Sequence, residues 1–192
     1  TRNYLAPPHP TGSRWSSLNR AVNDFIVEAN NVFQKPKVGL VSWGSDTFQY
    51  GRRYRASVLE SQLSTTYTPI TSRMSSLSSR TMIGATNLAA GLDEARQHIT
   101  NPRASSSSAN KTIILMTDGQ WNTGRHPYAA ARDCLAAGVT VHTVTFLPGS
   151  DQRTMQEIAR ITGGRFFHAT NEAQLRETFR ELARSLPVVL TN

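Results

Sequence analysis

The sequence predicts an α/β domain built as a three-layer, doubly wound and mainly parallel sheet with helices on both faces. Three observations carry this prediction. Strand-like and helix-like segments alternate from Pro36 to the C-terminus, which is typical of a parallel sheet with crossover helices. The run Ile113–Met116 has no polar face, as expected of a strand covered on both sides. The chain of 192 residues is long enough for one hydrophobic core.

The N-terminal part predicts a loop, a helix and a few short strands. Residues 1–14 contain three prolines and no apolar run, so we expect an extended loop or insertion there. Apolar residues then recur at helical spacing and predict a helix over about Ser16–Val32. The short apolar run Val38–Val41 predicts a strand covered on both faces. The segments Thr47–Tyr50 and Tyr54–Val58 predict a hairpin.

The rest of the chain alternates more regularly. Residues 59–82 are rich in Ser and Thr and predict only a weakly marked helix over about Ile70–Leu77. A loop over residues 83–87 precedes a clearly marked helix over Leu88–Ile99. Lys111–Thr117 is the strongest strand, expected deep in the sheet. The remaining predicted elements are helices over Pro127–Ala137, Asp151–Ile161 and Glu172–Leu186 and strands over Val139–Phe146 and Arg165–Ala169. We predict one domain over residues 15–192, preceded by the loop over residues 1–14.

The charge of the chain raises the question of an anionic partner. The net charge is +8 and the isoelectric point is near 10.4, but the basic residues are scattered and only Arg52, Arg53 and Arg55 cluster tightly. Because no interleaved aromatics or known nucleic-acid module accompany them, we expect a solvated basic surface. Cys134 is the one cysteine, which excludes an intrachain disulfide and a thiolate metal cage. The sequence shows no signal peptide and no apolar run long enough to span a membrane.

The candidate site lies in loops at the carboxyl ends of the predicted strands, where such sheets bind ligands. These loops are Gly44–Asp46, Gly84–Asn87, Asp118–Gly124 and Pro148–Asp151. Asp118 directly follows the most apolar strand, and Gly119 allows a sharp turn that projects the carboxylate. An Asp-Gly pair can also be a simple turn, and Thr86 alone can be a simple helix cap.

Several of these segments together resemble the von Willebrand factor A (VWA) domain. The resemblance rests on Thr117-Asp118-Gly119 after an apolar strand, on Gly84-Ala85-Thr86-Asn87 before a helix, and on Lys37–Ser45 and Thr140–Phe146. It covers the chain from about Arg14 to the C-terminus. Within the family, the Gly-Ser-Arg-Trp start, Ala169-Thr170-Asn171 and Leu186–Thr191 are most similar to bacterial proteins related to the tight-adherence (Tad) pilus-assembly component.

The resemblance implies a metal-ion-dependent adhesion site (MIDAS). In the family this site unites an Asp-x-Ser-x-Ser loop, a Thr from a second loop and an Asp from a third. Thr86 and Asp118 match the second and third elements. Hydroxyl and carboxylate oxygens suit Mg²⁺ or Mn²⁺, and an acidic side chain of a protein partner would complete the coordination. The resemblance also implies a location on the extracytoplasmic face of a bacterial cell envelope.

The sequence departs from the family pattern at its start. It contains no Asp-x-Ser-x-Ser, and no apolar strand precedes the first predicted helix, so the family's central first strand is absent. Either the domain is truncated at its N-terminus, with residues 1–14 an insertion, or the protein lacks the site. We favour truncation, because a sheet without its central strand exposes backbone and apolar surface. Two side chains alone cannot hold Mg²⁺ strongly.

The predicted function is therefore a protein-interaction module for adhesion or assembly, and not an enzyme. An α/β enzyme is the main alternative, since this architecture hosts many reactions. The sequence has no Gly-x-Ser-x-Gly elbow, dinucleotide fingerprint or Walker loop. We expect His142 and His168 to have packing or surface roles. A non-specific binder of nucleic acid or an anionic surface is the third alternative, and it rests on charge alone.

Overall fold

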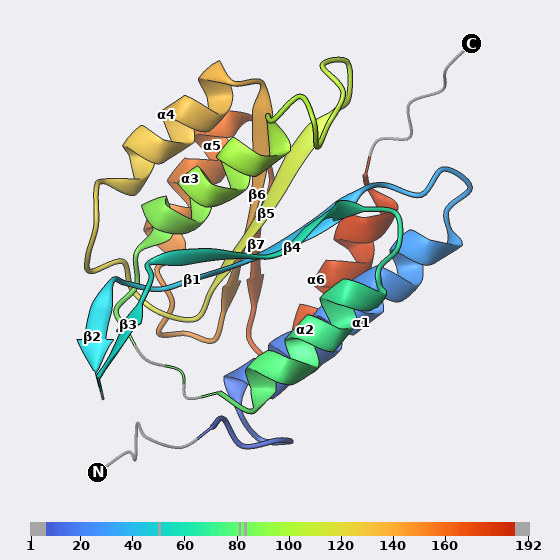
Figure 1. The fold of residues 1–192 in the computed structure, drawn as a ribbon. Helices are drawn as coiled ribbons and strands as arrows, with labels where there is room; N and C mark the ends of the chain where they lie inside the picture. The colour runs from blue at the N-terminus through green and yellow to red at the C-terminus, as the bar shows by residue number, and fades with distance from the viewer. Residues whose placement is uncertain (1–6, 50, 81, 83, 187–192) are drawn as a thin grey trace.

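The chain folds as strands between two layers of helices (Figure 1). The computed structural model describes residues 7–49, 51–80, 82 and 84–186. The helices are α1 (Arg14–Asn31), α2 (Thr68–Ser78), α3 (Leu88–Ile99), α4 (Pro127–Ala136), α5 (Gln152–Thr162) and α6 (Glu172–Arg184). The strands are β1 (Val38–Trp43), β2 (Thr47–Gln49), β3 (Arg52–Tyr54), β4 (Ser57–Ser64), β5 (Lys111–Thr117), β6 (Val139–Phe146) and β7 (Phe166–Ala169).

Some predicted segments include residues outside this description. They are the first six residues of the N-terminal loop, Tyr50 of the hairpin, Ile83 of the loop before α3, and Pro187–Thr191 of the C-terminal segment. No helix in the described part of the chain is long and apolar enough to cross a membrane.

The strands form three separate groups in the described structure. β5, β6 and β7 make a parallel sheet in that order, with Lys111 opposite Val139 and Thr117 opposite Thr145. β1 and β4 pair antiparallel, and β2 and β3 form the predicted hairpin. The α/β class is confirmed, with a parallel three-stranded sheet and an antiparallel pair in place of one continuous sheet.

Two helical layers cover the strands (Figure 1). On one side α3, α4 and α5 pack around a core that includes Leu88, Leu92 and Ile158, which are fully buried. On the other side α1, α2 and α6 enclose a second core that includes Ile70 and Leu175. Burial of these apolar side chains is the main favourable contribution to the stability of the layers.

Ion pairs between α1 and α6 tie the beginning of the domain to its end. Arg20 pairs with Glu172 at 2.5 Å, Asp24 with Arg176 at 2.6 Å, and Glu28 with Arg184 at 2.6 Å. Arg180 also reaches Asp24, at 2.8 Å. Because the partners advance together along both helices, α1 and α6 run parallel to each other. The arginine-rich face of α6 is therefore largely compensated by acidic residues of α1.

The prediction for residues 59–82 was wrong in part, because it missed strand β4. The hairpin strand predicted to end at Val58 instead ends at Tyr54, and β4 begins at Ser57. The serines of β4 interrupt the apolar alternation that would mark a strand in the sequence, and the strand is stabilised by pairing with β1. Glu60 on β4 is also buried, with its side chain 2% exposed, and it bonds to Ser42 and Arg73. A charged residue at a buried strand position breaks the alternation of apolar and polar residues by which a strand is recognised from sequence.

The prediction that β1 and β5 lie fully covered was also wrong. All six residues of β1 are only half-buried, and Ile114 and Met116 on β5 are half-buried as well. In the described structure β1 pairs only with β4, and β5 pairs only with β6. Each strand therefore has one unpaired edge, and this accounts for the exposure of two strongly apolar segments.

Candidate functional site

The four candidate loops meet at one edge of the molecule. Ser45, just after β1, accepts a hydrogen bond from the amide of Ala85 at 2.7 Å. The Thr86 amide donates to the Asn122 side chain at 2.9 Å, and the Asn122 amide donates to the Thr86 carbonyl at 3.3 Å. These bonds fix the loops after β1, before α3 and after β5 against one another.

The fourth loop joins the same assembly through Asp151. The Asp151 amide donates to the Gly119 carbonyl at 3.0 Å, and its carboxylate accepts from the Trp121 amide at 3.2 Å. The same carboxylate caps α5 by accepting from the Thr154 amide at 3.1 Å. Asp151 thus caps a helix and positions the loop that carries Asp118. Its role is structural, because both of its carboxylate oxygens already accept hydrogen bonds.

Thr86 and Asp118 lie on adjacent loops, and the glycine between them decides how closely the loops approach. A Cβ atom on Gly119 would lie 3.1 Å from the Thr86 hydroxyl oxygen, tighter than most real contacts. Gly119 therefore favours the close approach, whereas the turn itself does not require a glycine, because the φ of Gly119 is not positive. The structure places the two predicted residues at the same edge, with Thr86 half-buried and Asp118 43% exposed at its side chain.

Asp118 already has a cationic partner in this chain. Arg14, the first residue of α1, donates from Nη1 to the Asp118 carboxylate and to its backbone carbonyl, both at 3.3 Å. The Arg14 side chain is 48% exposed, so the pair is a surface ion pair of modest strength. The Arg14 guanidinium places a positive charge next to the Asp118 carboxylate, at the position where a bound divalent cation would otherwise supply it.

The residues present do not fit a divalent metal ion. Among the described residues no three His, Cys, Asp or Glu side chains converge as a metal-binding group. The Ser45 hydroxyl oxygen accepts a hydrogen bond from the Ala85 amide, and the Asp118 carboxylate forms an exposed ion pair with Arg14. One carboxylate and one threonine hydroxyl leave most of an octahedral shell unfilled, and Mg²⁺ keeps its water in such a setting.

Basic residues surround this edge. Arg52, Arg53 and Arg55 follow the hairpin turn next to the loop after β1, and all three are exposed. Arg53 lies 3.7 Å from Asp46, a long and exposed contact of little energetic weight. The arginine cluster noted in the sequence therefore lies beside the candidate site, where it favours a negatively charged ligand group.

Sequence reasoning missed Arg14, Ser45 and Asn122 as members of the site. Ser45 lay within a candidate loop and within a segment of the family resemblance but was given no role of its own, and Asn122 was one polar residue among several in the loop after β5. Arg14 could not be found from local pattern, because its contact with Asp118 spans 104 positions of the chain. Only the packing of the start of α1 against the end of β5 brings the two together.

His142, His168 and Cys134 have structural roles. His142 accepts the Arg165 amide at 2.9 Å, and burial together with the Arg165 charge lowers the pKa of His142. His168 hydrogen-bonds Thr145 at 2.9 Å. Cys134 is buried in α4, and burial raises the pKa of its thiol to about 11. A thiol with so high a pKa is neutral at physiological pH and is a poor nucleophile.

Comparisons with known proteins agree with the fold. The family model for the von Willebrand factor type A domain matches residues 10–181. Comparison with curated protein sequences finds no match for this chain.

Several solved structures share the fold at low sequence identity. Proximal thread matrix protein 1 from the mussel byssus, with a zinc-occupied MIDAS motif, has a TM-score of 0.68 and 18% identity over 90% of this chain and 42% of its own. The open pilus adhesin SpaC from Lactobacillus rhamnosus GG has a TM-score of 0.69 and 16% identity over 90% and 28%. Manganese-loaded TRAP protein of Plasmodium vivax has a TM-score of 0.63 and 19% identity over 93% and 69%.

The chain spans less than half the length of the mussel and pilus proteins. At these identities the likeness concerns the fold alone, whereas the family model covers most of the chain. Together with the loops that converge around Thr86 and Asp118, the match identifies the domain: the chain belongs to the von Willebrand factor type A domain family.

Proposed function

We propose that this domain is a protein-interaction module, not an enzyme, and that it contacts its partner through the edge formed by the loops around Thr86 and Asp118. One observation carries the proposal: four loops from distant parts of the chain are fixed together by mutual hydrogen bonds at an exposed polar edge. A preorganised surface of this kind loses little conformational entropy when it binds.

The positive charge at this edge favours a partner that presents an acidic group. Arg14 and the cluster Arg52, Arg53 and Arg55 are exposed there, and complementary charge speeds association and selects partners. Solved structures of the same fold include an adhesin and a zinc-occupied MIDAS motif. We place no metal ion in the contact made by this chain, because no three His, Cys, Asp or Glu side chains converge among its described residues.

The proposal also includes the cellular location of the protein. The segments around Gly12–Trp15 and Ala169–Asn171 resemble Tad-related bacterial proteins, and we propose a role in pilus assembly or adhesion on the extracytoplasmic face of a cell envelope. The residue-level proposal for Thr86 and Asp118 holds independently of this setting, since it rests on the geometry of the edge.

Site-specific photo-crosslinking tests the contact surface. A photoreactive residue at exposed Gln120, in the loop after Asp118, would be compared with one at exposed Ser107, in the loop before β5. We expect Gln120 alone to crosslink a discrete protein from an envelope extract. Excess wild-type chain should suppress the crosslink, whereas the Thr86→Ala/Asp118→Asn variant should not. Equal suppression by that variant, or equal crosslinking from Ser107, would refute the proposed surface, and added EDTA would report any dependence on metal.

A further inference from the structure

The hairpin of β2 and β3 projects from the rest of the domain (Figure 1). Among the described residues its two strands pair only with each other, and each is three residues long. None of its described residues belongs to either hydrophobic core. A hairpin this small contributes little stability by itself, so packing inside the domain does not explain which side chains it carries.

The hairpin has an inner face and an outer face. Residues directly opposite each other on paired strands share a face. Thr47 lies opposite Tyr54, and Phe48 lies opposite Arg53. Thr47 and Tyr54 are half-buried, so their face turns toward the domain. Phe48 is 72% exposed and the Arg53 side chain is 75% exposed, so the outer face presents a large apolar ring beside a positive charge.

Three exposed arginines give the hairpin a surplus of positive charge. We call them the hairpin arginines: Arg52, Arg53 and Arg55. Within the described residues, Arg53 is the one that lies near an acidic side chain, Asp46 at 3.7 Å, and both side chains of this pair are exposed. Three positive charges against one negative charge leave a surplus of two on this projection.

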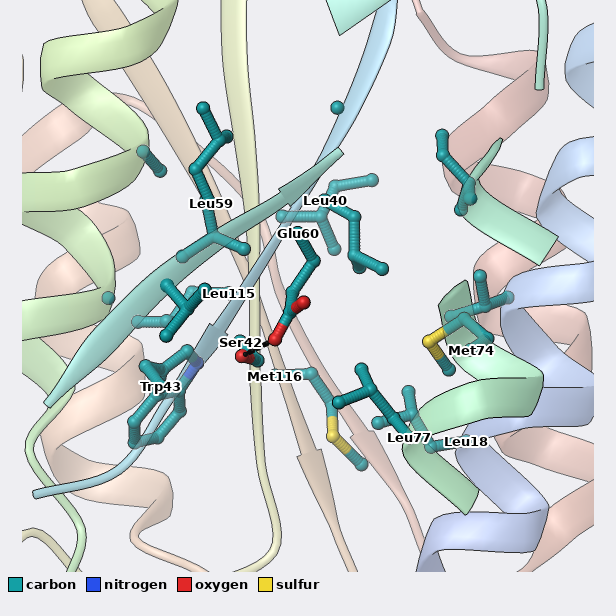
Figure 2. Close-up of a pocket in the computed structure, with 18 of the residues that line it drawn as sticks. Leu18, Leu40, Ser42, Trp43, Leu59, Glu60, Met74, Leu77, Leu115 and Met116 are labelled. Atoms are coloured by element: carbon teal, nitrogen blue, oxygen red, sulfur yellow. Dashed lines mark hydrogen bonds between the residues drawn. The ribbon is translucent and has the colours of Figure 1, made fainter. Parts of the chain in front are cut away.

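The hairpin arginines and two acidic residues border the space between β1 and β5. One acid, Glu60, bonds to Ser42 inside this space (Figure 2), and its second carboxylate oxygen pairs with Arg73. The other acid, Asp118, pairs with Arg14. Both carboxylates therefore have partners of their own, and the counter-charge for the hairpin arginines must come from solvent ions or from another molecule.

The same combination of side chains continues near the base of the hairpin. Gly84 lies against the loop that leads into β2, because an added Cβ at Gly84 would be 3.1 Å from the Ser45 hydroxyl oxygen. Arg80 and Met82 precede Gly84 in the sequence, and both are exposed. A second arginine and a second apolar side chain thus extend the surface that the hairpin presents.

The shape of the hairpin favours a flat anionic surface over an acidic polypeptide. A projection offers no concave pocket that would enclose peptide side chains, and strands of three residues are short for the addition of a peptide strand. The surface of a bilayer requires no complementary concavity. At that surface an aromatic ring rests at the level of the headgroups, and arginine binds phosphate oxygens through two parallel hydrogen bonds.

We propose that the β2–β3 hairpin docks the domain onto a bilayer that contains anionic phospholipids, with Phe48 in the headgroup layer and the hairpin arginines bound to lipid phosphates. The binding is reversible, because the attraction between arginines and the anionic surface falls with ionic strength and one aromatic ring buries little area. The proposal goes beyond the contact edge at Thr86 and Asp118 and uses neither residue.

Vesicle flotation with the full chain tests the proposal. Vesicles of phosphatidylglycerol and phosphatidylcholine in equal parts are compared with vesicles of phosphatidylcholine alone. We expect binding to the anionic vesicles to be at least about tenfold stronger and to weaken as salt is added. Excess inorganic phosphate at constant ionic strength should not displace the domain, because free phosphate offers no surface for Phe48.

Two triple variants remove the same charge from different places. The first replaces all three hairpin arginines with glutamine. The second replaces exposed basic residues elsewhere, namely Lys35, Arg103 and Arg132. Each variant lowers the net charge from +8 by three. We expect the hairpin variant to bind anionic vesicles at least about tenfold more weakly, since each arginine near the surface contributes about fivefold. The control should lose no more than about threefold, because more distant charges are screened.

A pair of phenylalanine variants tests the apolar part of the contact. Phe48→Ser removes the ring of the hairpin, whereas Phe33→Ser removes a fully exposed ring after α1. We expect Phe48→Ser to weaken vesicle binding by roughly fivefold or more and Phe33→Ser to leave it unchanged. Circular dichroism and Tm verify that each variant folds, which we expect because the substituted hairpin residues lie outside both cores.

The outcomes separate the possible ligands of the hairpin. Absence of binding to anionic vesicles, equal losses in the two triple variants, or unchanged binding of Phe48→Ser would each overturn the proposal. Binding of polyglutamate as strong as vesicle binding, lost in the same hairpin variants, would assign the hairpin to an acidic polypeptide instead. The Thr86→Ala/Asp118→Asn variant should still bind vesicles, so failure of the proposed contact edge and failure of membrane docking are distinguishable.

Discussion

The substitution Gly124→Ala measures how strongly the loop after β5 depends on one backbone conformation. Gly124 has φ +82°, and an added Cβ would lie 2.2 Å from Oδ1 of Asn87. Asn87 is the N-cap of α3, and this oxygen accepts the Ala90 amide at 3.1 Å. The Asn87 side chain must therefore rotate away and give up its cap when residue 124 acquires a Cβ.

The expected magnitude has two parts. Placing a non-glycine residue at positive φ costs about 1 kcal/mol, and loss of an asparagine N-cap costs about 1 kcal/mol. Gly124→Ala should therefore lower the free energy of unfolding by about 2 kcal/mol, with a fall in Tm of roughly 4–8 °C for a domain of this size. Urea denaturation monitored by circular dichroism measures the change, with an unchanged m-value as the check on two-state behaviour.

Gly138→Ala is the matched control. Gly138 has φ +67° but nothing lies within 4 Å of its added Cβ, so only the cost of the backbone conformation, about 1 kcal/mol, is expected. Asn87→Ala should cost about 1 kcal/mol alone and should add nothing to Gly124→Ala, which has already lost the cap. The reasoning is refuted if Gly124→Ala costs no more than Gly138→Ala, or if the double variant loses the full sum of the single variants.

Three further predictions concern charge and reactivity. Calorimetric titration of this chain with Mg²⁺ or Mn²⁺ should show no saturable binding below roughly millimolar concentration, because Arg14 engages the Asp118 carboxylate; saturable binding that Asp118→Asn removes would contradict this. Since the pKa of His142 is lowered in the fold, its contribution to stability should be complete above pH of about 6.5 and lost as pH falls below it. Urea midpoints from pH 8 to pH 5 should fall less in His142→Asn, and an identical fall would count against the assignment. Cys134, with a pKa near 11, should react with a thiol reagent at pH 8 only at the rate of opening, and rapid native-state labelling would show that burial does not protect it.

The sequence predicted the regular part of the fold well because the relevant signals are local. The bounds of α3, β5 and β6 agree with the structure to the residue, since apolar periodicity and flanking glycines or caps mark both ends. β4 was missed because its stability comes from pairing with β1 and from the buried contacts of Glu60. Tertiary pairing of this kind leaves little trace in a single strand's composition.

For the candidate site, the sequence predicted the loops but not their mutual contacts. Thr86 lies just before the predicted helix α3 and Asp118 just after the predicted strand β5, and these places in the sequence are enough to put both at one edge. The ion pair from Arg14 could not be predicted, because it depends on how α1 packs against the sheet. In the described structure that contact makes the Asp118 carboxylate part of an exposed ion pair.

The parallel contact between α1 and α6 has a consequence for how the chain acquires its structure. The residues that pair across it, such as Arg20 with Glu172 and Asp24 with Arg176, are separated by 152 positions. Closing a loop of this length has a high entropy cost, so we expect this contact to form late in folding. During synthesis α1 emerges first and its acidic face stays without a partner until the last helix is complete. A chain that stops before Glu172 would thus leave Arg20 and Asp24 of α1 without their partners on α6.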